Sequence, residues 1–159
     1  MTDGARSVEG EPDTSEAAAA PPTVLLHQYF TKAQVSLLRS AVSAAVAGAG
    51  LSGVLCDDFV LAVHELVTNA VRHGGGTGHL ALWQQADVLT CEIVDYGGQA
   101  GALPVRLAPP DQTGGRGLWM AHHLTGTLVL TQRLDGVTAA VSVRVTASPA
   151  TSTAVHRLF

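Results

Sequence analysis

The stretch "LAVHELVTNAVRHGGG", Leu61 to Gly76, decides how the sequence is interpreted. Apolar residues recur through it at helical spacing and three consecutive glycines close it, which predicts a helix from about residue 53 to residue 72. The 3.6-residue period gives this helix one apolar stripe, which includes Leu66, and a second stripe that carries Glu65 and Asn69. A carboxylate and a carboxamide therefore share one face of a helix that is otherwise suited to burial.

Glu65 and Asn69 are one turn apart, so their side chains lie about 5–6 Å from each other and can bind one small object. A solvated helix face is the ordinary alternative. The neighbouring residues, such as Val63 and Val67, are more apolar than a solvated face requires. A charged carboxylate among apolar groups is costly without a partner, and Mg²⁺ accepts both kinds of oxygen and usually brings phosphates with it. The pattern indicates a pocket for a metal ion and an anion.

The segment "HELVT" begins like the HExxH zinc motif, but Thr68 stands where the second histidine is needed. The pairs His64 with His73 and His122 with His123 do not have the spacing of ligands on one helix face. These four histidines therefore do not indicate a zinc site.

Two glycine-rich segments follow. "VDYGGQ" ends a predicted strand with Asp95, then Gly97 and Gly98. Such a sequence is typical of a turn, but an aspartate backed by glycines could also accept the exocyclic amine of a purine. "TGGRGLWM", residues 113–120, places glycines before a predicted helix, where free N–H groups attract anions. The alternative for this segment is a flexible hinge; it is not a P-loop.

The chain has 159 residues, 47% of them hydrophobic and 14% charged, which is typical of one globular domain. The formal charge of −4 is carried by the first sixteen residues, which contain five acidic residues and one arginine. The rest is neutral and has no basic stripe, which argues against nucleic acid as a partner. No segment is suited to span a membrane or to direct secretion, and two lone cysteines fit a reduced, cytoplasmic environment.

The pattern along the chain predicts an acidic disordered tail (1–22), one folded domain (23–146) and a flexible C-terminal tail (147–159). Within the domain, helices are predicted over about 31–48, 53–72 and 116–124, and strands over 23–30, 78–85, 87–96, 125–134 and 138–146. A long Gly/Pro/Gln-rich segment, about 96–114, is more typical of a functional lid than of a linker. The predicted fold class is an α+β two-layer sandwich, with a mixed, mainly antiparallel sheet and helices packed on one face.

Together, "HELVTNAVRHGGG", "VDYGG" and "GGRGLWMAHHL" resemble the N, G1 and G2 boxes of the GHKL superfamily, whose ATP-binding domain has the histidine-kinase-like ATPase fold. The resemblance covers about residues 24–145 and is greatest to the anti-sigma-factor serine/threonine kinase branch of bacteria. The G1 box departs from the family pattern, because Gln99 stands where the second glycine is expected.

The resemblance implies a role for each matching residue. Glu65 would be the general base, and Asn69 would coordinate the Mg²⁺ that bridges the ATP phosphates. Asp95 would accept a hydrogen bond from the adenine amino group, Gly97 would allow close approach to the ring, and Thr138 would reach adenine through water. The phosphates would be wrapped by Gly115, Arg116 and Gly117, and residues 99–114 would form the ATP lid.

The same resemblance implies a regulatory cycle. Such a protein holds an RNA polymerase sigma factor and phosphorylates, from ATP, a serine of an anti-sigma antagonist protein. Residues 24–49 would supply contacts to the sigma factor and to a second copy in a homodimer. The alternative is a regulatory interaction module, with or without nucleotide, that performs no catalysis.

Overall fold

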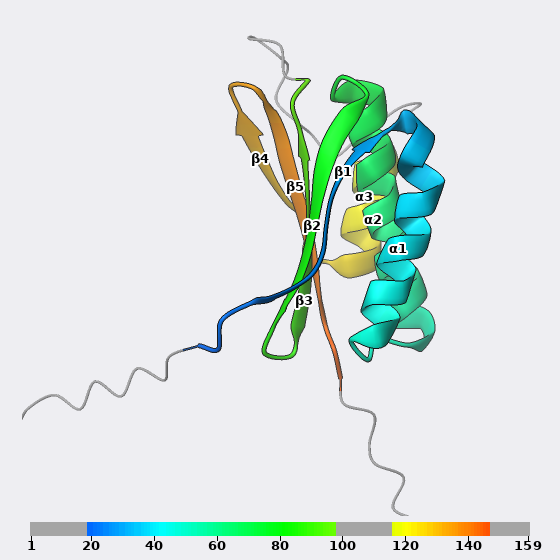
Figure 1. Cartoon of the computed structure of the whole chain (residues 1–159), viewed down its shortest axis with the longest axis vertical. Helices are drawn as coiled ribbons and strands as arrows, with labels where there is room; N and C mark the ends of the chain where they lie inside the picture. Colours follow the sequence, from blue (N-terminus) through cyan, green and yellow to red (C-terminus); the bar gives the residue numbers. More distant parts are fainter. Residues whose placement is uncertain (1–18, 98–115, 147–159) are drawn as a thin grey trace, which may run out of the picture.

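The computed structural model describes residues 19–97 and 116–146. They form two layers, a twisted sheet and a layer of helices on one of its faces (Figure 1). The order of elements is β1 (Thr23–Thr31), a 3₁₀ turn (Lys32–Gln34), α1 (Val35–Gly48), α2 (Gly53–His73), β2 (Thr77–Gln85), β3 (Val88–Asp95), α3 (Arg116–Thr125), β4 (Val129–Arg133) and β5 (Gly136–Arg144). The predicted α+β sandwich is confirmed, and most element boundaries agree to within two residues. The exceptions are α1, which begins at Val35 after the 3₁₀ turn and not near residue 31, and β4, which begins at Val129 and not near residue 125.

The five strands pair in the order β1-β2-β3-β5-β4. All four pairings among the described strands are antiparallel, so the sheet is not mixed as predicted. The reason lies in the connection that includes α3. It leads from β3 to the outer strand β4, and the tight hairpin after β4 brings β5 back between β3 and β4. Each strand therefore runs against its neighbours.

The core lies between the sheet and the helices. Period-two alternation along the strands sends one set of side chains toward the helices, including Leu80, Leu82 and Ile93, which are fully or almost fully buried. The apolar stripe of α2 meets them with Phe59, Val63, Leu66 and Ala70, all buried. Helix α2 packs between α1 and α3, so it is the central element of its layer (Figure 1).

No helix in residues 19–97 or 116–146 has the length and apolar character needed to cross a membrane. Cys91 is fully buried in the core and burial raises the pKa of its thiol, whereas Cys56 is only partly buried. Both cysteines are free thiols. Cys91 is therefore part of the apolar core, whereas Cys56 packs against that core and stays partly exposed.

Candidate functional site

The second stripe of α2 is half-buried. Glu65 and Asn69 are intermediate in exposure, between the buried apolar stripe and the solvent. Within residues 19–97 and 116–146, neither side chain has a hydrogen-bond or ion-pair partner. The first turn of α3 packs against this stripe: a Cβ atom added to Gly117 would lie 3.0 Å from Glu65 Oε2. Glu65 and Gly117 therefore lie next to each other in the structure.

Asp95 ends β3 and is buried, with 9% of its surface exposed. Its Oδ1 accepts a hydrogen bond from the main-chain N–H of Val137 at 3.2 Å. Its Oδ2 accepts none from a described residue. One oxygen of the carboxylate is thus fixed to the sheet, and the other keeps its capacity to accept a hydrogen bond from a ligand.

Glycines surround Asp95 because there is no room there for side chains. A Cβ atom added to Gly74, which caps the C-terminus of α2, would overlap the Asp95 side chain and lie 2.6 Å from Ala70 O. One added to Gly136 would lie 2.7 Å from Asp95 Oδ1, and one added to Gly97 would overlap the main chain of Gly74. The end of β3, the cap of α2 and the start of β5 therefore fit together only through bare main chain.

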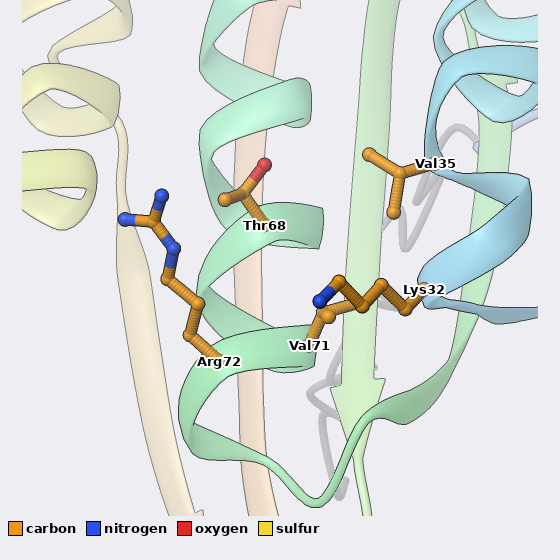
Figure 2. Close-up of a pocket in the computed structure, with 5 residues that line it drawn as sticks. All are labelled: Lys32, Val35, Thr68, Val71 and Arg72. Carbon is orange, nitrogen blue, oxygen red and sulfur yellow. The ribbon is translucent and has the colours of Figure 1, made fainter.

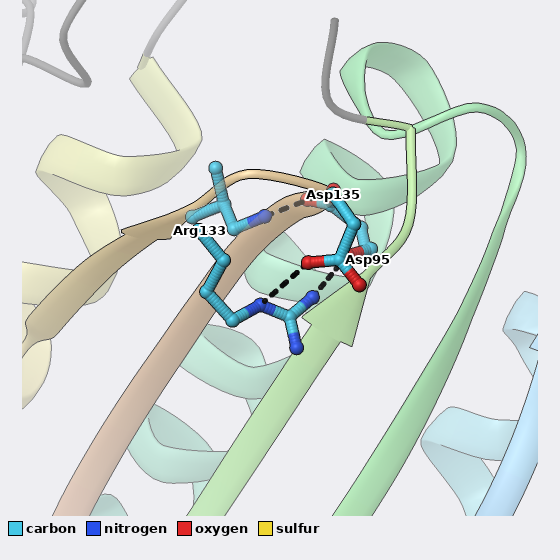
Figure 3. Close-up of polar contacts among 4 residues, drawn as sticks. Asp95, Arg133 and Asp135 are labelled. Atoms are coloured by element: carbon cyan, nitrogen blue, oxygen red, sulfur yellow. Dashed lines mark hydrogen bonds and ion pairs between the residues drawn. The ribbon is translucent and has the colours of Figure 1, made fainter. Parts of the chain in front are cut away.

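Arg133, from the end of β4, holds the main chain at Asp95 (Figure 3). Its Nη2 donates to Asp95 O at 2.8 Å, and its guanidinium lies over the Tyr96 ring, 5.4 Å from the centroid. Its Nε is 3.4 Å from Asp135 Oδ1, but this ion pair is partly exposed and the contact is not aligned as a hydrogen bond. The bond to Asp95 O is therefore the contact that orients the end of β3.

We expect Arg133→Ala to lower the free energy of unfolding by about 1.5–3 kcal/mol, because it leaves a half-buried carbonyl without its charged donor. Arg144→Ala is the matched control. Arg144 pairs with Asp87 at 2.6 Å near the other end of β5, but both side chains are largely exposed, so its loss should cost about 0–1 kcal/mol. Urea denaturation of both variants measures the difference. Equal losses would contradict the role of Arg133.

A pocket of 420 Å³ lies next to the polar stripe of α2, between α2 and the start of α1 (Figure 2). Val35 and Val71 form its apolar part, and Thr68 lines it from α2. Lys32 and Arg72 add two positive charges, and neither forms an ion pair with an acid in the described ranges. Arg72 lies one turn beyond Asn69, so the half-buried stripe ends beside a cation.

The register of the sheet separates Thr138 from the other predicted residues. Thr138 pairs with Val94, the neighbour of Asp95, so its side chain points to the face away from the helices. The position on the same face as Asp95 belongs to Val137, whose N–H binds the carboxylate. The structure therefore brings together Glu65 with Gly117 and Asp95 with Gly97, but it does not bring Thr138 to Asp95.

The remaining predicted residues fall at or beyond the limits of the described ranges. Arg116 begins α3, but the structure does not describe its side chain. Gly115 and the segment 99–114 lie outside the described residues. The sequence offered no signal for Arg133 or for the bond from the Val137 N–H to Asp95, because both contacts depend on how β5 pairs with β3.

The sequence of residues 30–145 matches the family described as the histidine kinase-like ATPase domain. The chain belongs to this family. Among solved structures, it resembles the crystal structure of the RsbU and RsbW domains of Rv1364c from Mycobacterium tuberculosis, with a TM-score of 0.57 and 22% sequence identity. That match covers 79% of this chain and 32% of the other. A search of curated proteins found no significant match.

Membership of this family implies an ATP-binding domain, and the described residues fit that ligand. The half-buried oxygens of Glu65 and Asn69 have no partner within residues 19–97 and 116–146, and they are of the kind that Mg²⁺ prefers as ligands. Asp95 retains an acceptor for an amino group, in a cradle too narrow for any residue but glycine. The domain therefore has groups suited to bind adenine at the C-terminal end of α2, and groups suited to bind a metal ion and phosphates nearer the middle of α2.

Proposed function

We propose that this protein is an ATP-binding anti-sigma regulator with serine kinase activity on an anti-sigma antagonist protein. One observation carries the proposal: a single helix, α2, presents Glu65 and Asn69 half-buried on one stripe and without a partner among the described residues, while its C-terminal cap contacts Asp95. The availability of these polar groups is what a nucleotide site requires.

The spacing along α2 fits an extended nucleotide. At 1.5 Å per residue, Asn69 lies about 7.5 Å and Glu65 about 13.5 Å along the helix axis from Gly74, which contacts Asp95. In the proposed arrangement the base lies at Asp95, the phosphates lie over Asn69, and the end of the triphosphate reaches Glu65. The order of the three residues then matches the order of the chemical groups of ATP.

Each residue has a defined task in the proposed reaction. Asp95 Oδ2 accepts a hydrogen bond from the exocyclic amine of adenine, and Gly97 leaves room for the ring. Asn69 supplies an oxygen to the metal, and a bound Mg²⁺ would offset the negative charge of the phosphates. Glu65 accepts the proton of the attacking serine hydroxyl. At the same time the serine oxygen bonds to the γ-phosphorus, and the bond from that phosphorus to ADP breaks. The first turn of α3, at Gly117, lies beside Glu65 and supplies main-chain N–H groups to the phosphates.

The proposed partners are a sigma factor, the antagonist protein that is phosphorylated, and a second copy of the chain in a homodimer, all in the cytoplasm. The sequence boxes that resemble anti-sigma kinases support this proposal, as does the likeness of fold to a structure that contains an RsbW domain. Since this chain spans 32% of the length of that chain, the activity of the larger protein is not carried over as a whole.

A second candidate is a regulatory module that binds nucleotide without catalysis. Val137 favours it, because this residue occupies the face of β5 beside Asp95 and has no side-chain hydrogen-bonding group for the base. Gln99, in place of the second glycine of the G1 box, points the same way. Incubation with labelled ATP and candidate antagonist proteins separates the two candidates, since only the kinase transfers phosphate.

Thermal unfolding with Mg·ATP tests the nucleotide site that both candidates share. At a hundredfold excess over Kd, binding should stabilise the protein by about 2.7 kcal/mol, which raises Tm by several degrees. Asn69→Ala and Asp95→Ala should lose this rise, because each removes an oxygen that binds the ligand. Absence of a shift in the wild-type protein at millimolar Mg·ATP would contradict nucleotide binding, and equal shifts in all three proteins would contradict the assigned residues.

A further inference from the structure

Two histidines form a close pair on the face of the sheet opposite to the helices. His27 of β1 pairs in register with Ala81 of β2, and Tyr29 pairs with His79, so the two imidazoles lie diagonally across the strands. Their Nε2 atoms are 2.6 Å apart, and their rings are edge-on, with centroids 4.1 Å apart. His27 is exposed and His79 half-buried. The pair is independent of the proposed nucleotide site, which lies on the other side of the sheet.

The contact brings two atoms of the same kind to one point. When both rings are neutral, the Nε2–H of one ring donates a hydrogen bond to the Nε2 of the other, so one proton lies between the two nitrogens. A metal ion in place of that proton would use both nitrogens as ligands. Nε2–metal bonds of about 2.0–2.1 Å place two neighbouring ligands about 2.8–3.0 Å apart at a right angle and about 3.3–3.4 Å apart at the tetrahedral angle. The present Nε2–Nε2 separation of 2.6 Å is shorter than these values by less than about 1 Å, a difference that small side-chain rotations supply.

The surroundings fix the two rings. The Tyr29 ring lies against His79, with centroids 4.7 Å apart, and against His27, at 6.4 Å. The main chains are held by the continuous pairing of β1 with β2 from Leu26 to Thr31. Rings held in this way lose less rotational freedom on binding a metal than two unrestrained surface histidines would.

Charge also favours a cation. Glu92 of β3 pairs in register with Ala81, the residue opposite His27, and its negative charge acts on His79. The small side chain of Ala81 lies between the imidazoles and the carboxylate. Burial, and then the neighbouring His27, lower the pKa of His79, which keeps that ring neutral and able to act as a ligand.

We propose that His27 and His79 chelate a divalent transition-metal ion of the Zn²⁺, Ni²⁺ and Cu²⁺ class. Imidazole nitrogen suits these ions, whereas Mg²⁺ requires oxygen ligands, so this site and the proposed Mg·ATP site take different metals. The described residues contain no group of three or more histidine, cysteine or acidic side chains arranged to hold a metal. Water therefore completes the coordination and the ion exchanges readily, with Glu92 acting as an outer carboxylate that binds through that water or through an imidazole N–H.

Metal titration of the full chain, without an affinity tag and after treatment with a chelator, tests the proposal. Calorimetry with Zn²⁺ should give one ion per chain, and the electron paramagnetic resonance spectrum of bound Cu²⁺ should show two imidazole nitrogens. His27→Asn and His79→Asn should each weaken Zn²⁺ binding at least about 10-fold, and the double variant should be little worse than either single one, because either change destroys the chelate. Glu92→Gln should weaken it about 10-fold.

His122→Asn is the matched control, since His122 is an exposed histidine on α3. It should leave Zn²⁺ binding unchanged, and circular dichroism should show that all variants are folded. Millimolar Mg²⁺ should not compete, and Mg·ATP should not alter Zn²⁺ affinity. The proposal is overturned if the wild-type protein fails to bind Zn²⁺ or Cu²⁺, or if His122→Asn weakens binding as much as His79→Asn. It is also overturned if His27→Asn and His79→Asn bind like wild type; the pair is then a hydrogen bond only.

Discussion

Glu65→Gln is expected to reduce phosphate transfer to the antagonist protein by about 10²–10⁴-fold, because the amide cannot accept the proton of the attacking hydroxyl. The variant keeps the size and position of the side chain, so Mg·ATP binding should remain close to wild type. Single-turnover transfer of labelled phosphate measures the chemical step, and thermal shift with Mg·ATP measures binding in the same samples. Glu65→Ala should give the same separation of transfer from binding.

Asp57→Asn provides the matched control. Asp57 is an exposed carboxylate on α2, about two turns before Glu65, and its neutralisation should change neither transfer nor binding. Transfer by Glu65→Gln at the wild-type rate would remove the assignment of the general base. Loss of Mg·ATP binding together with transfer would instead assign Glu65 to the metal or to the phosphates.

Gly97→Ala is expected to abolish the response to Mg·ATP and to lower the free energy of unfolding by about 1–3 kcal/mol. The added methyl group would overlap main-chain atoms of Gly74, which cannot move away as the end of a side chain could. The end of β3 must then separate from the cap of α2, and Asp95 moves with it. Urea denaturation and Mg·ATP thermal shift measure the two effects.

Gly48→Ala is the control for this change. Gly48 is the last residue of α1, and a Cβ atom there would have no atom within 4 Å. Alanine should therefore stabilise the protein by about 0.5–1 kcal/mol, because glycine is unfavourable in a helix. If Gly97→Ala behaves like Gly48→Ala, the close packing around Asp95 does not limit the site.

The periodicity of the sequence was sufficient to predict the helices and strands, because burial determines both patterns. The stripes of α2 are the clearest case: Phe59 and Leu66 are buried, and Glu65 and Asn69 lie at the boundary with solvent. The hairpin of β2 and β3 and the end of β3 at Asp95 also followed from local signals. The assignment of the sheet as mixed was wrong, since strand direction depends on where the chain crosses after α3 and no local pattern records this.

The environment of Asp95 could be predicted only in part for the same reason. The residues beside it in sequence, Tyr96 and Gly97, were apparent, but those from the last hairpin depend on the register between β3 and β5. A shift of one residue in that register exchanges the faces of Val137 and Thr138. Alignment to family boxes suggested Thr138, whereas the pairing of Val94 with Thr138 turns that side chain away from the helices.

The irregularity in β1 has a consequence for how this protein meets other chains. β1 is the outer strand of the sheet beyond β2, and its register shifts between Val24 and Leu26. An outer strand offers free main-chain groups on which a foreign strand can add, and a bulge interrupts the regular spacing that such addition needs. Only the stretch from Leu26 onward is regular enough to accept a new strand, so the irregularity shortens the edge along which unfolded chains could begin to aggregate.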